Sequence, residues 1–418
     1  MPGQCPVRHD FQMLEQPFVQ DPYSTCPVVQ ESPVFWSSEL ECYVVTRYAD
    51  VEMVLSDHVR FSNVATNVPV TPINEKAQRV LDDSEVWFRP NLTNADAPRH
   101  TMVRRWVADA MSPRRIRGLE HGVRTWASTA VDKMVAKGRA DIYADLCFPL
   151  PAITGFTLIG FPKEDVEQLK AWCDRRVVLT YGRASGDEQV EVAENVAAFW
   201  RYTNEFAQSR IDDPRDDLTS DLVKHHLEDP GEFSLRDVSA VLFGLSIAAH
   251  ETTTNLMTNA VRQLLSHRDQ WEALVTDPSL IPNTIEECLR FDGPVIAWRR
   301  RATEDVLVSG ITIAKDSVVL MLFYSANHDP RRFDRAGTFD IRRAEARYHL
   351  TFGKGTHFCA GAPMARMEMK ILLENLIERA PSMWLVPDQQ LSFVPNISQR
   401  GPHGLLVDFA PERTVTHD

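Results

Sequence analysis

One cysteine near the C-terminal end of the chain has the surroundings of a reactive or metal-binding thiol. Cys359 lies in residues 352–361, which read Phe-Gly-Lys-Gly-Thr-His-Phe-Cys-Ala-Gly. Gly353 and Gly355 permit turn conformations that other residues avoid, and a strongly helix-forming stretch begins near Ala362. A thiol just ahead of a helix faces free N–H groups and the positive end of the helix dipole, which favour the thiolate. We therefore expect a metal ligand or a nucleophile; a small buried apolar residue is the competing interpretation.

A second unusual stretch lies inside a long predicted helix. Ser234 and Asp237 have the spacing of an N-terminal capping box, and the helical pattern continues to about Leu265. Residues 248–255, in its middle, read Ala-Ala-His-Glu-Thr-Thr-Thr-Asn. Threonine and asparagine are poor helix formers, and threonine hydroxyls can donate to carbonyls of the preceding turn and bend the helix. Such a patch in a well-formed helix indicates function, although a buried helix that tolerates threonine would give the same pattern.

A third candidate is a basic pair at the start of another predicted helix. Asp96 and Pro98 predict the beginning of this helix, with Asp96 as its N-cap. His100 and Arg104 are four residues apart and therefore share one helix face. By themselves they predict only a solvated basic surface.

The elements that must position these residues are mostly helical. From residue 115 to about 224 the pattern is helical throughout, and a short helix is predicted over 48–55. Residues 57–95 show no sustained period, and a loop of that length is usually functional. Its apolar residues either line a pocket or pack in the core: Phe61, Val64, Val68, Trp87 and Phe88. Strands are predicted at 33–37, 42–47, 317–324 and 391–409.

Composition narrows the class of protein. The net charge of −13 argues against a nucleic-acid or anionic-membrane partner. Seven scattered cysteines imply no disulfide framework, so we expect reduced thiols and a cytoplasmic location. No apolar run is long enough to span a membrane, and the polar N-terminus lacks a signal-peptide core. Without repeats or linkers, residues 1–418 predict a single domain, with a loose tail over 1–20.

The segment around Cys359 resembles the haem-binding loop of the cytochrome P-450 superfamily, Phe-Gly-x-Gly-x-His-x-Cys-x-Gly, at every position. The resemblance implies haem b, with Cys359 as the axial iron ligand, His357 at a propionate, and Phe352 and Gly353 beside the porphyrin. The implied fold is a mainly helical prism with a small β-rich region, with haem between the long helix and the Cys loop. The likeness covers about residues 30–410, and it extends most to haem domains of self-sufficient bacterial members with a fused phthalate-family reductase.

The same resemblance assigns roles to the unusual helix. Residues 248–252 are similar to the family's oxygen-binding segment Ala-Gly-x-(Asp/Glu)-Thr. It implies that Thr252 hydrogen-bonds dioxygen, that Glu251 brings in protons, and that Asn255 joins this relay. Ala248 and Ala249 would lie beside the haem. Ala249 stands where the family usually has Gly, so we expect its methyl to narrow the oxygen groove.

Further residues follow from the resemblance. His100 and Arg104 match the element Asp-x-Pro-x-His-x-x-x-Arg and, with Arg300, would bind the propionates. A buried structural network holding the thiolate loop would be formed by Glu287 and Arg290, in a Glu-x-x-Arg pattern, with Arg343. The substrate pocket would be lined by Leu245, Val295, Ile296 and Ala297, with residues 396–398 reaching into it.

The implied reaction inserts one atom of O2 into a small apolar organic substrate by hydroxylation, epoxidation or O-dealkylation. The sequence up to Asp418 contains no flavin or ferredoxin domain. We therefore expect electrons from an external [2Fe–2S] ferredoxin or a flavin reductase that docks near Cys359. A cluster of basic residues predicts either part of that docking surface or a solvated face: Arg105, Arg114, Arg115 and Arg117. The alternatives are a peroxide-driven enzyme, which would not need the Glu–Thr pair, and a non-catalytic haem-binding or sensor protein.

Overall fold

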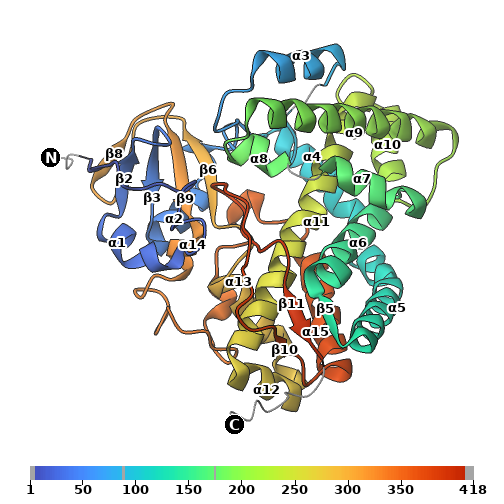
Figure 1. The fold of residues 1–418 in the computed structure, drawn as a ribbon. Helices are drawn as coiled ribbons and strands as arrows, with labels where there is room; N and C mark the ends of the chain where they lie inside the picture. Colours follow the sequence, from blue (N-terminus) through green and yellow to red (C-terminus); the bar gives the residue numbers. More distant parts are fainter. Residues whose placement is uncertain (1–4, 87–89, 174–175, 410–418) are drawn as a thin grey trace, which may run out of the picture.

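Helices make up most of the molecule and surround one long helix, whereas the largest sheet lies at one side (Figure 1). The computed structural model describes residues 5–86, 90–173 and 176–409. The predicted mainly helical α+β class is confirmed. The helices are α1 Cys26–Glu31, α2 Tyr48–Ser56, α3 Glu75–Asp83, α4 Arg99–Ala110, α5 Pro113–Lys137, α6 Pro149–Ile159, α7 Val166–Cys173, α8 Arg176–Tyr181, α9 Gly186–Asp212, α10 Leu218–Glu228, α11 Leu235–Ser266, α12 Arg268–Thr276, α13 Ile281–Phe291, α14 Phe323–Asn327 and α15 Ala362–Arg379.

α11 is the central helix, and its predicted start is confirmed. The Ser234 hydroxyl accepts from the Asp237 N–H at 3.2 Å, and the Asp237 carboxylate accepts from the Ser234 N–H at 2.9 Å. These two bonds satisfy N–H groups that have no partner inside the helix. With 32 residues, α11 is about 48 Å long. It packs on α6, α9, α10 and α13.

The two ends of α11 belong to different hydrophobic clusters. Its first half, including Leu242 and Phe243, packs with residues of α6 and α9. Its second half, including Met257 and Leu264, packs with residues of α5, α13 and α15. The polar patch 248–255 lies between these two clusters. Apolar contacts therefore anchor the helix on both sides of its least helix-favouring segment.

The β-rich side contains a six-stranded mixed sheet in the order β1-β2-β3-β9-β6-β4. The strands predicted at 33–37 and 42–47 are confirmed as β2 and β3, which form an antiparallel hairpin with Trp36 opposite Tyr43. β9 lies parallel to β3 and antiparallel to β6, which carries three consecutive arginines. The strands are β1 Val7–Arg8, β2 Val34–Ser37, β3 Cys42–Val45, β4 Phe61–Ser62, β5 Arg139–Asp141, β6 Ala297–Ala302, β7 Val306–Val308, β8 Ile311–Ile313, β9 Val318–Leu322, β10 Trp384–Leu385 and β11 Leu406–Asp408.

The N-terminal segment is ordered from residue 5, so the predicted loose tail was wrong for residues 5–20. β1 pairs with β2, and the side chains of Phe11, Met13 and Phe18 are buried. The ring centroids of Phe11 and Phe35 lie 5.1 Å apart in an edge-to-face contact. The apolar residues of this segment follow no helical or strand period, so the sequence offered no periodic signal for their burial. Residues 1–4 lie outside the described part of the chain.

The region before α4 also differs from expectation. α3 forms within the predicted long loop, and its N-cap Asn74 accepts from the N–H groups of Lys76 and Ala77. Asp96 is not the N-cap of α4. Its carboxylate instead accepts from the Asn63 N–H at 3.0 Å and from the Ser62 hydroxyl. These bonds fasten the end of β4 to the segment that enters α4.

Among the described helices, none combines the length and the apolar character that a bilayer-spanning helix requires.

Candidate active site

The loop before α15 holds Cys359 by backbone bonds and glycine turns. Gly353 and Gly355 have φ angles of +70° and +71°, which glycine adopts without strain. At Gly355 there is little space as well, because a Cβ atom would lie 3.1 Å from the Leu55 carbonyl oxygen. The Cys359 N–H donates to the Phe352 carbonyl at 2.9 Å. The predicted position of Cys359, just ahead of a helix, is confirmed.

The ionisation of Cys359 reflects two opposing effects. Burial raises the pKa of the thiol, while N–H groups of Gly361 and Ala362 and the guanidinium of Arg104 act in the opposite direction. Burial is the larger effect, so the helix terminus alone does not favour the thiolate as predicted. The N–H groups nevertheless point where a metal-bound sulfur would carry negative charge.

A cavity of about 250 Å³, called the haem cavity below, lies between this loop and α11. Apolar side chains dominate its walls. Eleven residues singled out from the sequence line it: Cys359, His357, Phe352, Gly353, Arg104, Arg300, Ala248, Ala249, Thr252, Leu245 and Val295. The structure thus brings together residues that are up to 255 positions apart in the chain, from Arg104 to Cys359.

The cations of the haem cavity lack anionic partners. Burial lowers the pKa of Arg300 to about 10 and also lowers the pKa of Arg104. Neither guanidinium forms an ion pair with any residue that the structure describes. The rings of His100 and His357 stack with centroids 3.7 Å apart. Within the described residues, the buried Nε2 of His100 has no hydrogen-bond partner.

These unpaired groups fit a flat cofactor that carries two carboxylates. Buried cations are costly unless an anion accompanies them. Haem offers two propionates at one edge and an iron atom that a Cys thiolate can ligate. Arg104, Arg300, His100 and His357 would meet the propionates, and Cys359 would face the iron. The donor set therefore fits haem b.

α11 presents Thr252 to the haem cavity. Its hydroxyl donates to the Ala248 carbonyl at 3.0 Å, and Thr258 makes the same bond to Thr254 at 2.8 Å. The predicted bonding of threonine to the preceding turn is therefore confirmed. Because the hydroxyl donates within the helix, its oxygen keeps acceptor capacity toward the cavity.

Ala249, which departs from the family pattern, lies against α6. A Cβ atom placed on Gly155 would come within 2.7 Å of the Ala249 Cβ. The glycine of α6 therefore makes room for the methyl of α11. Both residues also line the haem cavity, so the Ala249 methyl lies at its margin.

Glu251, Asn255 and Ile296 do not line the haem cavity. They line a smaller cavity of about 20 Å³, the rear cavity, which has room for a water molecule. Its remaining walls come from residues 13–22, Val177 and residues 393–403. The sequence predicts that residues 396–398 reach into the substrate pocket. In the structure, Asn396 lines the rear cavity instead. Ala297 lines neither cavity and packs in the core beside the sheet.

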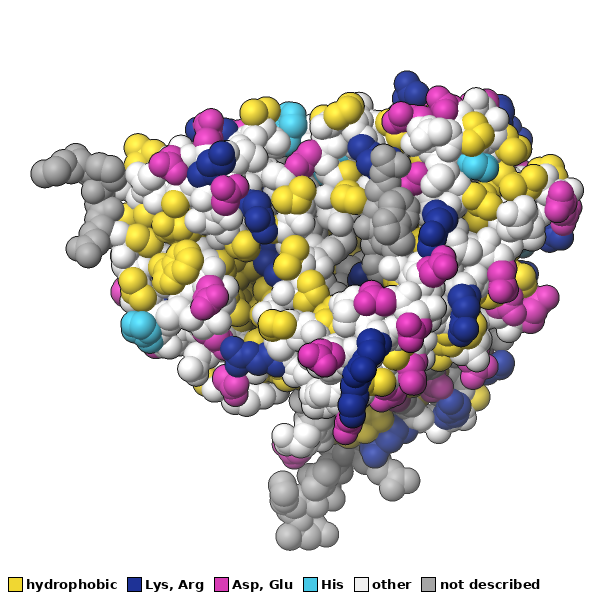
Figure 2. All heavy atoms as spheres, turned by 90° about the horizontal axis from the view of Figure 1, so that it is seen from above, with side chains coloured by type: hydrophobic (Ala, Val, Ile, Leu, Met, Phe, Trp, Pro, Cys, Tyr) yellow, Lys and Arg dark blue, Asp and Glu magenta, His cyan; other side chains and the backbone are white. Residues whose placement is uncertain are grey.

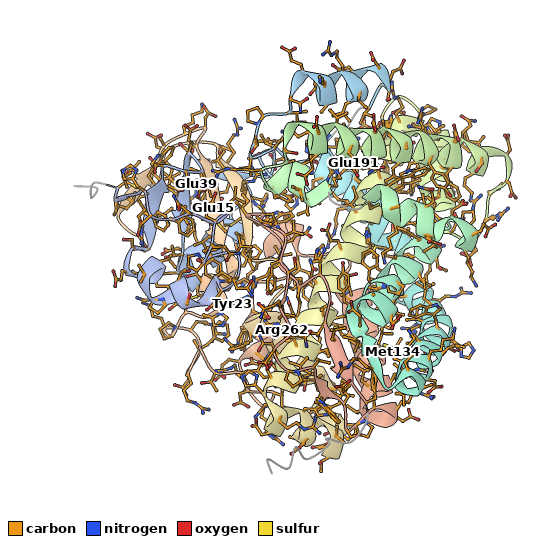
Figure 3. The ribbon with its side chains drawn as sticks, viewed as in Figure 1. Glu15, Tyr23, Glu39, Met134, Glu191 and Arg262 are labelled. Atoms are coloured by element: carbon orange, nitrogen blue, oxygen red, sulfur yellow. The ribbon has the colours of Figure 1, made fainter. Side chains whose placement is uncertain are left out.

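A buried network braces the walls of the rear cavity. The Tyr23 hydroxyl donates to Asp292 at 2.5 Å, and the Arg262 guanidinium pairs with the same carboxylate. Figure 3 shows Tyr23 and Arg262 close together, one from the N-terminal segment and one from α11. Arg400 donates to the Val19 carbonyl at 2.7 Å. No sequence pattern predicted this network, because its members are scattered over nearly 380 positions.

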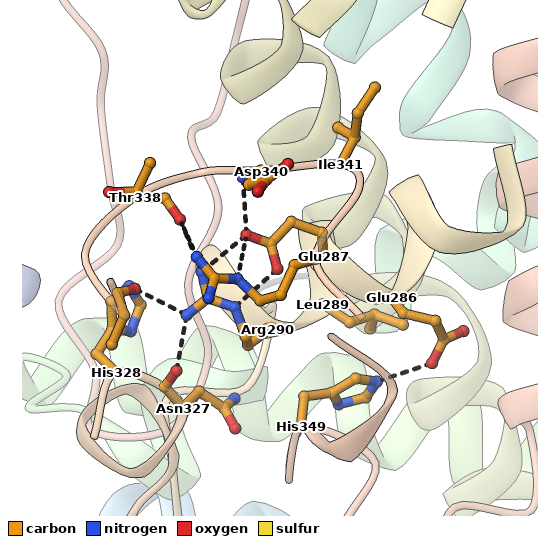
Figure 4. A network of polar contacts seen from close by, with 12 residues as sticks. Glu286, Glu287, Leu289, Arg290, Asn327, His328, Thr338, Asp340, Ile341 and His349 are labelled. Atoms are coloured by element: carbon orange, nitrogen blue, oxygen red, sulfur yellow. Dashed lines mark hydrogen bonds and ion pairs between the residues drawn. The ribbon is translucent and has the colours of Figure 1, made fainter. Parts of the chain in front are cut away.

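The predicted structural residues form one buried network, in which Figure 4 shows Glu287 and Arg290 facing each other. Arg290 binds Glu287 through two bonds of 2.7 and 2.8 Å, and Arg343 approaches Glu287 at 3.3 Å. All three side chains are buried. Arg290 also donates to the Asn327 carbonyl at 2.9 Å. The Asn327 amide then donates to the Thr351 hydroxyl at 2.9 Å, which links the network to the start of the Cys loop.

The distal wall of the haem cavity differs from the sequence prediction. Phe61 packs in the core, and Val64 and Val68 are exposed, so these three do not line it. Trp87 and Phe88 lie outside the described residues. Polar neighbours of these positions line the cavity instead: Asn63, Asn91 and Thr93. The positions of apolar residues in the sequence do not reveal them, because burial of a short polar side chain depends on tertiary contacts.

Comparison with known proteins points to one family. Residues 187–380 match the family described as Cytochrome P450. The cytochrome P450 monooxygenase PikC of Streptomyces venezuelae is 34% identical over 406 residues, which cover 95% of this chain and 93% of that protein.

Solved structures share the fold. An intact type IV self-sufficient cytochrome P450 monooxygenase matches 97% of this chain with a TM-score of 0.93 and 36% identity. The match covers 53% of that protein, so this chain spans about half its length. Cytochrome P450 CREJ, in complex with (4-ethylphenyl) dihydrogen phosphate, matches with a TM-score of 0.92 and 34% identity, over 96% of this chain and 100% of that one.

Proposed function

The chain belongs to the cytochrome P450 family and is a haem-dependent monooxygenase, and on that premise we propose that it oxidises small, largely apolar aromatic molecules with electrons from a separate redox partner. The haem cavity carries this proposal. It has a thiol on one side, a helix with Thr252 on the other, unpaired cations at one end and apolar walls around the remaining space. Bound haem supplies the activation of O2.

We assign the haem-binding roles to residues that line this cavity and to His100, which does not line it but stacks on His357. Cys359 would ligate the iron, and the N–H groups of Gly361 and Ala362 would stabilise the charge on its sulfur. Arg104, Arg300 and the stacked pair His100 and His357 would bind the propionates. Their lack of other anionic partners among the described residues supports this assignment.

We assign proton handling to the two faces of α11. Thr252 faces the haem cavity, whereas Glu251 and Asn255 face the rear cavity. A water in the rear cavity would pass a proton to the Glu251 carboxylate, and Thr252 would accept a hydrogen bond at the oxygen site. Gly401 keeps Asn255 in this position, because a Cβ atom there would lie 2.2 Å from the Asn255 Oδ1.

The substrate class follows from the apolar wall opposite Cys359. Leu245, Val241 and Val295 line it, and the cations lie at the propionate end. CREJ holds an alkylphenyl phosphate in its solved complex. For this chain we propose the alkylphenyl part as the recognised unit and hydroxylation of an alkyl C–H bond as the reaction. Epoxidation and O-dealkylation remain possible outcomes of the same chemistry.

The redox partner would dock on the side of Cys359. Phe358, next to the cysteine, is 41% exposed. Arg115 pairs with Asp216 and Asp221, which removes it from the predicted basic cluster. Arg105, Arg114 and Arg117 are exposed and are the cations that we assign to an acidic [2Fe–2S] ferredoxin or flavin reductase. On the face seen in Figure 2, the described basic and acidic side chains are interspersed, so we do not place the partner there.

Two other functions use the same fold. A peroxide-driven enzyme would have no use for Thr252 and Glu251, which argues against it. A haem sensor would bind ligands without turnover. A cytoplasmic location stays a prediction, supported by the fact that no disulfide joins cysteines among the described residues.

The test begins with the carbon monoxide difference spectrum of the reduced holoprotein. A strongly red-shifted Soret band would show thiolate ligation. The second step is NADH- and O2-dependent oxidation of 4-ethylphenol with a surrogate ferredoxin and its reductase. Product formation supports the proposal; a thiolate spectrum with peroxide-only turnover supports the peroxide-driven alternative, and no turnover at all supports the sensor.

A further inference from the structure

Asn91 is a polar residue on the wall of the haem cavity, next to the first half of α11. Asn91 lines the cavity, and its Nδ2 donates to the Ala240 carbonyl at 3.0 Å. The next turn of α11 has no side chain at this point. A Cβ atom on Gly244 would lie 3.5 Å from Nδ2 and 3.8 Å from Oδ1 of Asn91. The amide therefore rests on the helix surface in the space that Gly244 leaves open.

The orientation of this amide is fixed by its partner. A carbonyl oxygen only accepts, so the atom that faces Ala240 must be the amide nitrogen. The Asn91 backbone is fixed too: its N–H donates to Asn94 Oδ1 at 3.1 Å, and its carbonyl accepts from the Ala95 N–H at 2.8 Å. Two hydrogen-bonding functions of the side chain remain, the Oδ1 acceptor and the second N–H, and neither has a partner among the described residues.

The position of the amide relative to the reacting centre suggests its use. Gly244 is one helical turn, about 6 Å, from Ala248, and two turns, about 12 Å, from Thr252. Val241 and Leu245, from the same stretch of α11, line the cavity near Asn91. In apolar surroundings a polar group without a partner costs free energy, and a hydrogen bond to it discriminates strongly against ligands that cannot make one.

We propose that Asn91 is a specificity-determining residue that binds a hydroxyl group of the substrate, with para-alkylphenols as the ligand class. The phenolic O–H donates to Oδ1, the ring lies along α11 between Asn91 and Ala248, and the alkyl C–H bonds point toward Thr252. The proposal rests on the proposed function, which places the oxygen site at Thr252. It adds a hydrogen-bond requirement to a pocket whose walls are mainly apolar.

The test compares two ligands in two proteins. Spin-state titrations of the ferric holoenzyme would give dissociation constants for 4-ethylphenol and for ethylbenzene, which lacks only the hydroxyl. The variant Asn91→Leu keeps a similar volume and removes the amide. We expect the preference for the phenol over the hydrocarbon to fall by about fivefold in the variant. An amide that only fastens the loop would change both dissociation constants alike and leave their ratio within about twofold, which would overturn the proposal.

A control variant and a third ligand make the result decisive. Leu245→Met changes the neighbouring wall at nearly constant volume, so it should move both constants together. If Asn91→Leu does not take up haem, the wild-type enzyme decides: 4-ethylanisole, which can accept but not donate, should bind less tightly than 4-ethylphenol. Equal binding of these two would overturn the role of Oδ1. Thiolate-ligated enzyme that responds to none of the three ligands would instead overturn the proposed substrate class, and Asn91 with it.

Discussion

The Cys359 side of the haem cavity and the α11 side are built in different ways. Below the cavity, Glu287, Arg290 and Arg343 bind one another and nearby carbonyls at full burial. Above it, α11 directs Thr252 into one cavity and Glu251 and Asn255 into another. A network with satisfied partners is costly to rearrange, whereas groups that face cavities remain available to water and substrate. The first side is suited to hold a ligand in place, and the second directs polar side chains toward the two cavities.

Removal of the proposed iron ligand, Cys359, should have the greatest effect. We expect Cys359→Ser to abolish the red-shifted carbon monoxide band, because a hydroxyl does not replace a thiolate as iron ligand. Cys5→Ser is the matched control, since Cys5 lies far away in the N-terminal segment and is only half-buried. A red-shifted band that persists in Cys359→Ser would contradict the assignment of the ligand.

The next largest effect is expected in the buried network of Glu287, Arg290 and Arg343. Arg290→Ala leaves Glu287 buried without its main partner, which typically costs about 3–5 kcal/mol. We expect a large fall in the free energy of unfolding and in haem content, because Asn327 and Thr351 connect this network to the Cys loop. Arg342→Ala, an exposed arginine beside Arg343, is the control. Chemical denaturation and the ratio of haem to protein measure the effect, and normal haem content in Arg290→Ala would show that the loop stands without the network.

On the α11 side, a small change should alter chemistry and leave stability intact. We expect Thr252→Ala to lower the share of NADH electrons that reaches product by about tenfold, because the oxygen site loses its hydroxyl. Haem content and melting temperature should stay near those of the wild type. Thr252→Ser restores the hydroxyl and should recover most of the coupling. Equal coupling in the Ala and Ser variants would mean that the hydroxyl is dispensable.

Glu286 of α13 binds His349, which precedes the Cys loop, and Arg366, which follows it. This contact can be tested through its pH dependence. Burial alone would raise the pKa of Glu286, but hydrogen bonds from Arg366 and His349 outweigh it and lower the pKa to about 2. The folded-state pKa thus lies below the unfolded value, so this stabilisation is present above about pH 4.5 and is lost as the pH falls toward 2. We expect Glu286→Gln to cost about 1–2 kcal/mol at pH 7.

The difference between wild type and Glu286→Gln should shrink as the pH is lowered from 5 to 3. Denaturation at several pH values measures it. Glu272→Gln is the control, since Glu272 forms only an exposed pair with Arg268 and should show little difference at any pH. A difference that grows in acid would reverse the assigned direction.

Local contacts were predicted from the sequence, whereas contacts between distant residues were not. The Cys loop and the capping box of α11 are local patterns, in which the residues that interact are neighbours in the chain. Thr252 back-bonding to Ala248 is local as well. By contrast, the hydrogen bond from Asn91 to the Ala240 carbonyl joins residues 149 positions apart. The hydrogen bond from Arg400 to the Val19 carbonyl joins residues 381 positions apart. Such contacts depend on tertiary packing, which no short-range pattern encodes.

The failures have the same physical origin. Asp96 has the type and position of an N-cap, yet tertiary contacts with Ser62 and Asn63 take its carboxylate away from the helix. The N-terminal segment has no periodic apolar pattern, yet Phe11 and Phe18 pack into the sheet side. The apolar residue Phe61 belongs to the core, whereas the polar residue Asn63 lines the haem cavity. Local signals therefore identified the chemistry, and packing decided which side chains surround it.

A smaller effect is expected from the close contact between Gly401 and Asn255 on the wall of the rear cavity. Gly401→Ala would place a methyl 2.2 Å from the Asn255 Oδ1, so the asparagine must move. If Asn255 and Glu251 carry protons through the rear cavity, turnover should fall by about two- to threefold, and its solvent deuterium isotope effect should rise. Gly337→Ala is the control, because a Cβ atom there meets nothing within 4 Å. Since Thr252 lies on the other face of α11, the spin-state response to substrate should not change in either variant. An altered substrate response in Gly401→Ala would show that the helix does not separate the two cavities functionally, and unchanged turnover would remove Asn255 from the proton route.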